Sequence, residues 1–268
     1  NGVLLPIGIV SGCSKVALTH LPTRPTVVAN GMAAAINNSE SARASERELW
    51  TSLTSSSDGY VDRHFNRPVG RPLSQWLIHT SVSPNAVSLA SILIGLAAAV
   101  CFVSGSYAAG IVGAVLFQIS AVIDCVDGDI ARAVFKESPL GKWLDLAGDQ
   151  VVHVAVFATI ATGLYQRDNA ISVLWLGLSA VAGALLSFAV VVRGMKRLSE
   201  KPNTLLQRLI DSATNRDFSV LVLALAVANE IDLFLWLVAI GSHAFWIALY
   251  WLQRSGSRSL RARVPTPA

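Results

Sequence analysis

The stretch VIDCVDGDIARAVFKESPLGKWLDLAGDQ, residues 122–150, carries six acidic residues between two long apolar runs. The whole chain of 268 residues is 53% hydrophobic and only 14% charged, with a mean hydropathy of +0.52. Soluble domains carry about a quarter charged residues. The composition therefore predicts an integral membrane protein, and a group of carboxylates at the membrane edge calls for a functional explanation.

Apolar segments around this stretch predict an all-α bundle of six transmembrane helices within residues 83–253. Their approximate ranges are 86–104, 109–131, 143–165, 171–192, 218–229 and 232–252. Ser83 or Asn85 suits the N-cap of the first helix. The fifth range is shorter than the usual span of about 20 residues. We therefore expect it to extend toward Ser212 and to be shielded by its neighbours.

The chain before the bundle divides into two parts. We interpret residues 1–42 as an N-terminal arm or the remnant of an upstream soluble domain, and the start at Asn1 fits a fragment of a longer polypeptide. Residues 43–82 predict amphipathic juxtamembrane helices, because Leu73, Trp76 and Leu77 recur at helical spacing. An ordinary soluble helical linker is the alternative.

Arginines recur every fourth residue in this juxtamembrane region. Arg63, Arg67 and Arg71 would share one face of an unbroken helix. Pro68 and Pro72 predict interruptions of that helix.

Basic residues predict the orientation of the bundle. The loops 104–109 and 165–170 carry no net charge, whereas the loop 193–217 and the tail 254–268 are basic. Because the basic side is cytoplasmic, both termini and the acidic stretch are expected there. The net charge of +4 then predicts contact with anionic lipids and not with nucleic acid. The three scattered cysteines predict neither a disulfide framework nor a cysteine metal site.

Helical geometry places four residues of the second span on one face. At about 100° per residue, Asp124, Asp127, Gly128 and Ala131 fall in one sector. Asp129 points elsewhere, and we expect it to be solvated or to lie outside the helix. We expect neither Asp129 nor Glu137 to take part in the site.

The third span continues this arrangement. Asp145 and Asp149 are four residues apart and share a face, with Gly148 on the same side removing bulk. Four close carboxylates require cations to stay ionised, and oxygen ligands select Mg²⁺, Mn²⁺ or Ca²⁺. Two such ions suit phosphoryl transfer. The alternative is a set of helix-end charges at the lipid boundary.

Residues 124–149 also carry the longer pattern D-x2-D-G-x2-A-R-x8-G-x3-D-x3-D. In identity and spacing it resembles the signature of the CDP-alcohol phosphotransferase family, and the likeness covers about residues 45–253. The matching residues are Asp124, Asp127, Gly128, Ala131, Arg132, Gly141, Asp145 and Asp149.

The resemblance implies a transferase with two divalent cations, Mg²⁺ or Mn²⁺, that works as a homodimer, with residues 83–253 as its catalytic domain. The donor would be a CDP-linked alcohol, often CDP-diacylglycerol. An acceptor hydroxyl would attack the phosphorus that bears the alcohol, and CMP would leave. The implied metal ligands are Asp124, Asp127, Asp145 and Asp149. The implied cytidine-diphosphate cradle is Asp127, Gly128, Ala131, Arg132 and Gly141.

Two positions within this resemblance have particular consequences. Asp149 is implied to act also as the general base, because a base must reach the acceptor proton. Relatives often carry Arg at the position of Gln150, so one donor contact is not carried over.

The signature does not name the acceptor. Relatives with phosphorylated acceptors use extra basic residues to bind them. Basic residues at this end of the bundle in the present chain could form such a pocket, or could only set the orientation in the membrane by the positive-inside rule. The candidates here are Arg193, Lys196, Arg197 and Arg216. His153, one turn after Asp149, is either a further cleft residue or a buried histidine of the core.

The preferred acceptor is of the inositol-phosphate type, in phospholipid or polar-head synthesis. The stretch DGYVDRHFNRPVGRPLSQWLIHTSVSPN, residues 58–85, is similar to the same region of family members fused to a soluble nucleotidyltransferase. Some of those members make inositol-phosphate diesters from CDP-inositol.

A non-enzymatic divalent-cation-binding membrane protein or transporter is the alternative function. It would use the same carboxylates but would have no need for Gly128, Ala131 and Arg132. Transport sites also tend toward the bilayer midplane, whereas these carboxylates lie near one end of their helices.

Overall fold

The computed structural model describes residues 26–29, 32–35, 58–134, 138–200 and 218–261, and the single residues 40, 44, 47, 50 and 53. From residue 60 onward, every regular element of this part of the chain is helical, which confirms the predicted all-α bundle. A short hairpin in the N-terminal arm was not expected from the sequence. Its strands β1 (Thr26–Ala29) and β2 (Met32–Ala35) pair antiparallel, with Thr26 opposite Ala35.

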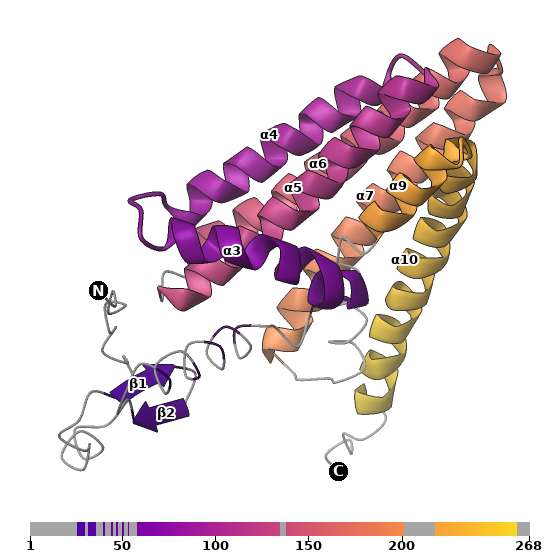
Figure 1. Ribbon diagram of the computed structural model, residues 1–268. Coiled ribbons are helices and arrows are strands. Elements are labelled where there is room, and N and C mark those ends of the chain that lie inside the picture. Colours follow the sequence, from indigo (N-terminus) through magenta and orange to yellow (C-terminus); the bar gives the residue numbers. More distant parts are fainter. Residues whose placement is uncertain are drawn as a thin grey trace, which may run out of the picture.

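The helical part begins with a short π-helix and an amphipathic helix that precede the bundle (Figure 1). The elements are η1 (Asp62–Asn66), α3 (Arg67–Leu77), α4 (Pro84–Phe102), α5 (Tyr107–Ala133), α6 (Pro139–Asp168), α7 (Ile171–Glu200), α9 (Phe218–Val227) and α10 (Ile231–Arg261).

Five of these helices are long and apolar enough to cross a membrane. The candidate spans are Pro84–Phe102, Tyr107–Ala133, Pro139–Asp168, Ile171–Lys196 and Ile231–Arg254. At 1.5 Å per residue, the ten residues of α9 cover about 15 Å, half of a hydrocarbon core of about 30 Å. The fifth predicted span is therefore only a short apolar helix among the described residues, and its expected extension toward Ser212 lies outside them.

Serine residues define where three of the long helices begin. The side chains of Ser83, Ser106 and Ser138 accept hydrogen bonds from the backbone three residues later, at the start of α4, α5 and α6. Such caps satisfy amide groups that have no partner within the helix. Of the two predicted caps for the first span, Ser83 is the one that the structure uses.

The helices run up and down, and α7 and α10 lie side by side in the same direction. Ser179 contacts His243, and Gln253 donates to the carbonyl of Val190. The main core cluster unites residues of α4, α5, α6, α7, α9 and α10. At its centre, the rings of Phe117, Phe157, Phe218 and Phe234 pack against one another.

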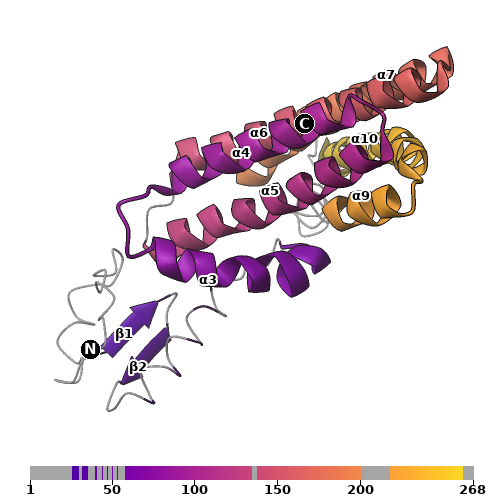
Figure 2. The same cartoon turned by 45° about the horizontal axis from the view of Figure 1, so that its top comes forward.

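Helix α3 lies against the end of α5 that carries the acidic residues (Figures 1 and 2). A Cβ atom at Gly70 would lie 2.9 Å from a methyl group of Val126 and 3.2 Å from the carbonyl oxygen of Val122, so the missing side chain permits this close approach. The helix continues through Pro72, so the interruption predicted there is wrong. Pro68 stands in the first turn, where proline is tolerated.

The apolar and polar faces of α3 lie in different surroundings. Val69, Leu73 and Trp76 are exposed, whereas Arg67 on the opposite side is buried against α5. Arg63 belongs to η1 and is exposed. The arginines at four-residue spacing therefore do not share one environment.

A substitution at Gly163 is expected to destabilise the bundle at its other end. A Cβ atom there would overlap the carbonyl oxygen of Phe102 and lie 3.0 Å from the amide nitrogen of Gly105. Because these are backbone atoms, we expect Gly163→Ala to cost about 1–3 kcal/mol, measured by thermal unfolding in detergent. Gly110→Ala is the matched control, since no heavy atom lies within 4 Å of the added group. Equal melting temperatures for the two variants would contradict this packing.

Candidate functional site

Three carboxylates from two helices form a compact cluster at one end of the bundle. Asp124 and Asp127 lie on α5 and Asp145 lies on α6, and one oxygen from each lies within 4.8 Å of the others. The short connection between α5 and α6 joins these helices at this end. The three groups are half-buried, buried and exposed, respectively, so the cluster forms the rim of an accessible site.

The donor set of this cluster fits a hard divalent cation. Carboxylate oxygens are the ligands that Mg²⁺ and Mn²⁺ prefer. Three like charges at this spacing also repel one another unless a cation neutralises them. Among the residues that the structure describes, this is the group of acidic, histidine or cysteine side chains arranged for a metal ion.

Two serines of α4 hold the carboxylates of α5 in place. Ser88 Oγ donates to Asp127 Oδ2, and Ser91 Oγ lies 3.4 Å from Asp124 Oδ1. Both serines are buried. They were not predicted as site residues, although their three-residue spacing on an otherwise apolar helix was the available signal.

Asp149 lies one turn after Asp145 on α6 and is half-buried. It is not part of the three-carboxylate cluster. The family resemblance implies two roles for it, a further metal ligand and the general base.

A cleft of about 130 Å³ opens beside the cluster. The predicted nucleotide-binding residues Asp127, Gly128, Ala131, Arg132 and Gly141 all line it. The other lining residues are Pro84, Asn85, Ser88, Ser138, Lys142 and Asp145. Three helix ends, from α4, α5 and α6, therefore build one cleft.

The glycines near the cleft have different roles. A Cβ atom at Gly128 would lie 3.1 Å from Nη2 of Arg132, and one at Gly141 would lie 3.2 Å from Oδ1 of Asn85. Their missing side chains therefore keep the cleft open. Gly148 instead faces the bundle interior, where a Cβ atom would overlap Ile92. The expectation that Gly148 clears space for the cleft is wrong, because its space is used for contact between α4 and α6.

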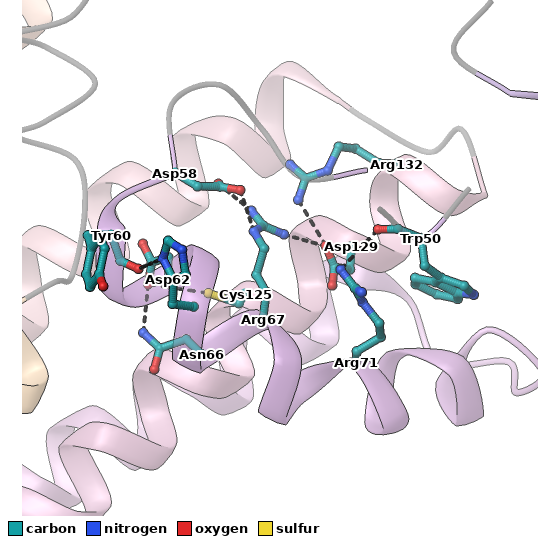
Figure 3. A network of polar contacts seen from close by, with 11 residues as sticks. Trp50, Asp58, Tyr60, Asp62, Asn66, Arg67, Arg71, Cys125, Asp129 and Arg132 are labelled. Carbon is teal, nitrogen blue, oxygen red and sulfur yellow. Dashed lines mark hydrogen bonds and ion pairs between the residues drawn. The ribbon is translucent and has the colours of Figure 1, made fainter. Parts of the chain in front are cut away.

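Asp129 is buried, with 3% of its surface exposed, so the expectation of a solvated bystander is wrong. Arg67 Nη1 donates to Asp129 Oδ1, and Nη2 of Arg132 lies 3.3 Å from the same oxygen (Figure 3). Helix α3 covers this face of α5 and supplies the arginine. The Glu137 side chain lies outside the described residues.

Arg67 is held by a second carboxylate as well. Its Nε and Nη2 each lie 2.6 Å from an oxygen of Asp58 (Figure 3). Burial alone would lower the pKa of Arg67, but the hydrogen bond to Asp58 and the charge of Asp129 raise it above its ordinary value. Arg67 is therefore a permanent buried cation beside the cleft.

A second polar chain follows α5 into the bundle. Asn66 donates to Asp62 at 2.7 Å, and Gln118 donates to Asn66 at 2.6 Å. The thiol of Cys125 lies 3.6 Å from the same carboxylate of Asp62. All four side chains are buried, which accounts for the polar residues of η1 as anchors on α5.

The structure describes the side chains of only two of the four predicted acceptor residues. Arg193 and Lys196 are exposed near the end of α7, at the same end of the bundle as the acidic cluster. The side chain of Arg197 and the whole of Arg216 lie outside the described residues. His153 packs among the rings of Phe117, Phe157 and Phe218, which agrees with a core histidine and not with a cleft residue.

Comparisons with known proteins identify relatives that are similar in sequence. The chain is 30% identical over 190 residues to the bifunctional IPC transferase and DIPP synthase of Rubrobacter xylanophilus, covering 71% of this chain and 41% of that protein. It is 29% identical over 203 residues to the phosphatidylinositol phosphate synthase of Cutibacterium acnes, covering 73% and 90%. The chain spans only 26% to 41% of the bifunctional relatives that it matches.

The fold itself matches a solved structure. The crystal structure of Mycobacterium tuberculosis phosphatidylinositol phosphate synthase, with CDP-DAG bound, superposes with a TM-score of 0.54 at 16% identity, covering 68% of this chain and 92% of that one. Residues 81–251 match the sequence profile described as CDP-alcohol phosphatidyltransferase. With the acidic cluster and its cleft inside that range, the chain belongs to the CDP-alcohol phosphatidyltransferase family of transferases.

Proposed function

We propose that this protein transfers a substituted phosphate group from a CDP-linked alcohol to the hydroxyl of an inositol-phosphate-like acceptor, with release of CMP. The observation that carries this proposal is the joint geometry of cluster and cleft. Three carboxylates of two helices converge at the rim of the cleft that Gly128, Ala131, Arg132 and Gly141 line. A site built only to hold cations has no need for such an open, arginine-bearing cleft.

The donor is of the CDP-diacylglycerol or CDP-inositol type. Arg132 suits the diphosphate, because a guanidinium donates several hydrogen bonds in one plane to phosphate oxygens. The missing side chains at Gly128 and Gly141 leave room for the nucleotide next to the helices. The bound CDP-DAG in the M. tuberculosis relative supports the lipid form of the donor.

Asp124, Asp127 and Asp145 would hold two divalent cations, Mg²⁺ or Mn²⁺, with Asp149 as a further ligand. When bound, such ions neutralise charge on the phosphate oxygens and on the departing CMP. The serine contacts to Asp124 and Asp127 orient the carboxylates before any ion arrives.

The remaining chemistry belongs to side chains of this chain. Asp149 accepts the proton of the acceptor hydroxyl, whose oxygen forms a new bond to the phosphorus that bears the donor alcohol. The bond between that phosphorus and the bridging oxygen of the diphosphate breaks, and CMP departs with the electron pair. Arg132 binds the diphosphate of the donor in the cleft.

The acceptor would meet the basic end of α7. Arg193, Lys196, Arg197 and Arg216 form the proposed anion pocket, which suits the phosphate of an inositol phosphate. The name of the C. acnes relative, phosphatidylinositol phosphate synthase, supports this choice of acceptor.

A charge removal at Arg193 tests the acceptor pocket. We expect Arg193→Gln to raise KM for inositol phosphate about tenfold, the effect of losing about 1.4 kcal/mol of phosphate binding. The KM for the donor should stay unchanged. Because Arg193 is exposed, folding should not suffer, and Arg254→Gln near the end of α10 serves as a matched control. An unchanged acceptor KM would remove Arg193 from the pocket.

The membrane arrangement follows the same proposal. The acidic cluster and both termini face the cytoplasm. Together with the five long helices, α9 belongs to a bundle of six spans. Residues 254–268 form a basic cytoplasmic tail. The exposed Val69, Leu73 and Trp76 of α3 would lie in the membrane interface. The active form would be a homodimer in contact with lipids and without nucleic acid.

Release of CMP tests the proposed reaction directly. Purified protein in lipid is supplied with Mg²⁺ or Mn²⁺, with CDP-diacylglycerol or CDP-inositol as donor, and with inositol phosphate, glycerol phosphate, inositol or serine as acceptor. Metal-dependent CMP release with one donor–acceptor pair is the expected result. Metal binding without any CMP release would favour the non-enzymatic cation-binding protein or transporter.

A further inference from the structure

Four charged side chains form a continuous chain from the juxtamembrane segment to the cleft. Asp58 and Asp129 alternate with Arg67 and Arg132, and each neighbouring pair is in contact (Figure 3). The side chains of Asp58, Arg67 and Asp129 are only 7%, 7% and 4% exposed, whereas that of Arg132 is 24% exposed. The chain therefore starts in the interior and ends at the one member that lines the cleft.

The arginine at the end of this chain has a defined position. Nη2 of Arg132 contacts Asp129, and the same nitrogen would lie 3.1 Å from a Cβ atom at Gly128. The guanidinium thus folds back over Gly128 on its own helix, at the wall of the cleft. Asp129 holds it there, although Asp129 itself does not line the cleft.

The charge balance at Asp129 depends on Arg67, a residue that is distant from it in sequence. A buried carboxylate needs a cation close by. Asp129 receives one from Arg67, 62 residues earlier in the chain. With Arg67 present, Asp129 is neutralised from the α3 side, so Arg132 can exchange its contact for one with a phosphate at small cost.

We propose that Arg67 and Asp129 are positioning residues that set the place and the availability of Arg132 in the donor cleft. This inference rests on the proposed donor and adds a role for helix α3, which carries Arg67 across the end of α5. Without Arg67, Arg132 is, among the described residues, the cationic side chain left in direct contact with Asp129. Arg132 is then drawn from the cleft, and the negative potential at the diphosphate rises.

A pair of variants separates this electrostatic role from a loss of packing. Arg67→Gln is expected to raise KM for the CDP-linked donor about tenfold or more, equal to about 1.4 kcal/mol, with kcat and acceptor KM within a factor of about two. The double variant Arg67→Gln with Asp129→Asn should recover most of the donor affinity. The Asp129→Asn side chain keeps an oxygen that can accept a hydrogen bond from Arg132. Because it carries no charge, it needs no neighbouring cation.

A merely structural role of Arg67 predicts a different pattern. The double variant would then be no better than Arg67→Gln, and kcat would fall together with donor affinity. Arg63→Gln is the matched control, because Arg63 is an exposed arginine in the preceding turn. Arg67→Lys should retain part of the donor affinity, since it keeps the charge without the double contact to Asp58.

A second measurement does not depend on turnover. Phenylglyoxal labels arginine side chains, and peptide mass spectrometry reports the labelling rate of Arg132 in each variant. We expect slower labelling in Arg67→Gln and restored or faster labelling in the double variant. Equal labelling rates would overturn the positioning role even if the wild-type protein were active. Absence of CMP release by wild type, with the labelling pattern intact, would instead overturn the proposed function alone.

Discussion

Asp145→Asn is expected to reduce CMP release by at least about 10³-fold. Asp145 is the contribution of α6 to the three-carboxylate cluster, and asparagine keeps the shape but removes the charge. Bound cations contribute several kcal/mol to stabilising the transferred group, and each 1.36 kcal/mol corresponds to a factor of ten in rate. The initial rate of CMP release at saturating donor, with Mg²⁺ or Mn²⁺ varied, measures the effect.

The design of this experiment uses the exposure of Asp145. Since an exposed side chain contributes little to the packing of the bundle, Asp145→Asn should unfold at the wild-type temperature. Asp168→Asn is the matched control on the same helix, because Asp168 is exposed near the opposite end of α6. Wild-type activity in Asp145→Asn at low metal concentration would show that the cluster does not hold the catalytic ions.

The second large effect is expected for Asp149→Asn. Loss of a general base costs about 10²–10⁴-fold in rate, so kcat should fall by this factor. Because Asp124, Asp127 and Asp145 would still hold the cations in this variant, affinity for CDP in the presence of Mg²⁺ should fall less than in Asp145→Asn. This combination differs from Asp145→Asn, in which metal-dependent CDP binding should also weaken.

Titration calorimetry with CDP and Mg²⁺, together with single-turnover rates, distinguishes the two variants. If Asp149→Asn turns over at the wild-type rate, another group accepts the proton. If it loses metal-dependent CDP binding as Asp145→Asn does, Asp149 serves chiefly as a metal ligand.

The acidic site was predictable because its residues are close in sequence. Asp124, Asp127, Gly128 and Ala131 lie within about two turns of one helix, so the period of 3.6 residues places them on one face. Asp145 follows in the next helix after a short connection. The structure brings the carboxylates of Asp124, Asp127 and Asp145 together.

Other features required contacts between distant segments. The helical period correctly predicted that Asp129 points away from the cleft. It could not predict that α3 covers that face of α5 with Arg67. Likewise, Ser88 and Ser91 became part of the site only when α4 packed against α5. The continuity of α3 through Pro72 also departed from local rules, because packing against neighbours outweighs local preference.

By itself, the sequence determined the class of this protein: an apolar helical bundle with a specific acidic signature at one end. Hydrophobic length and helical period are local properties, so composition and spacing suffice to predict them. Only the tertiary structure decided which carboxylates converge, which glycines open the cleft, and that Arg67 stands behind Asp129 and Arg132. These outcomes depend on which helix faces touch, and a buried charge can be balanced by a residue anywhere in the chain.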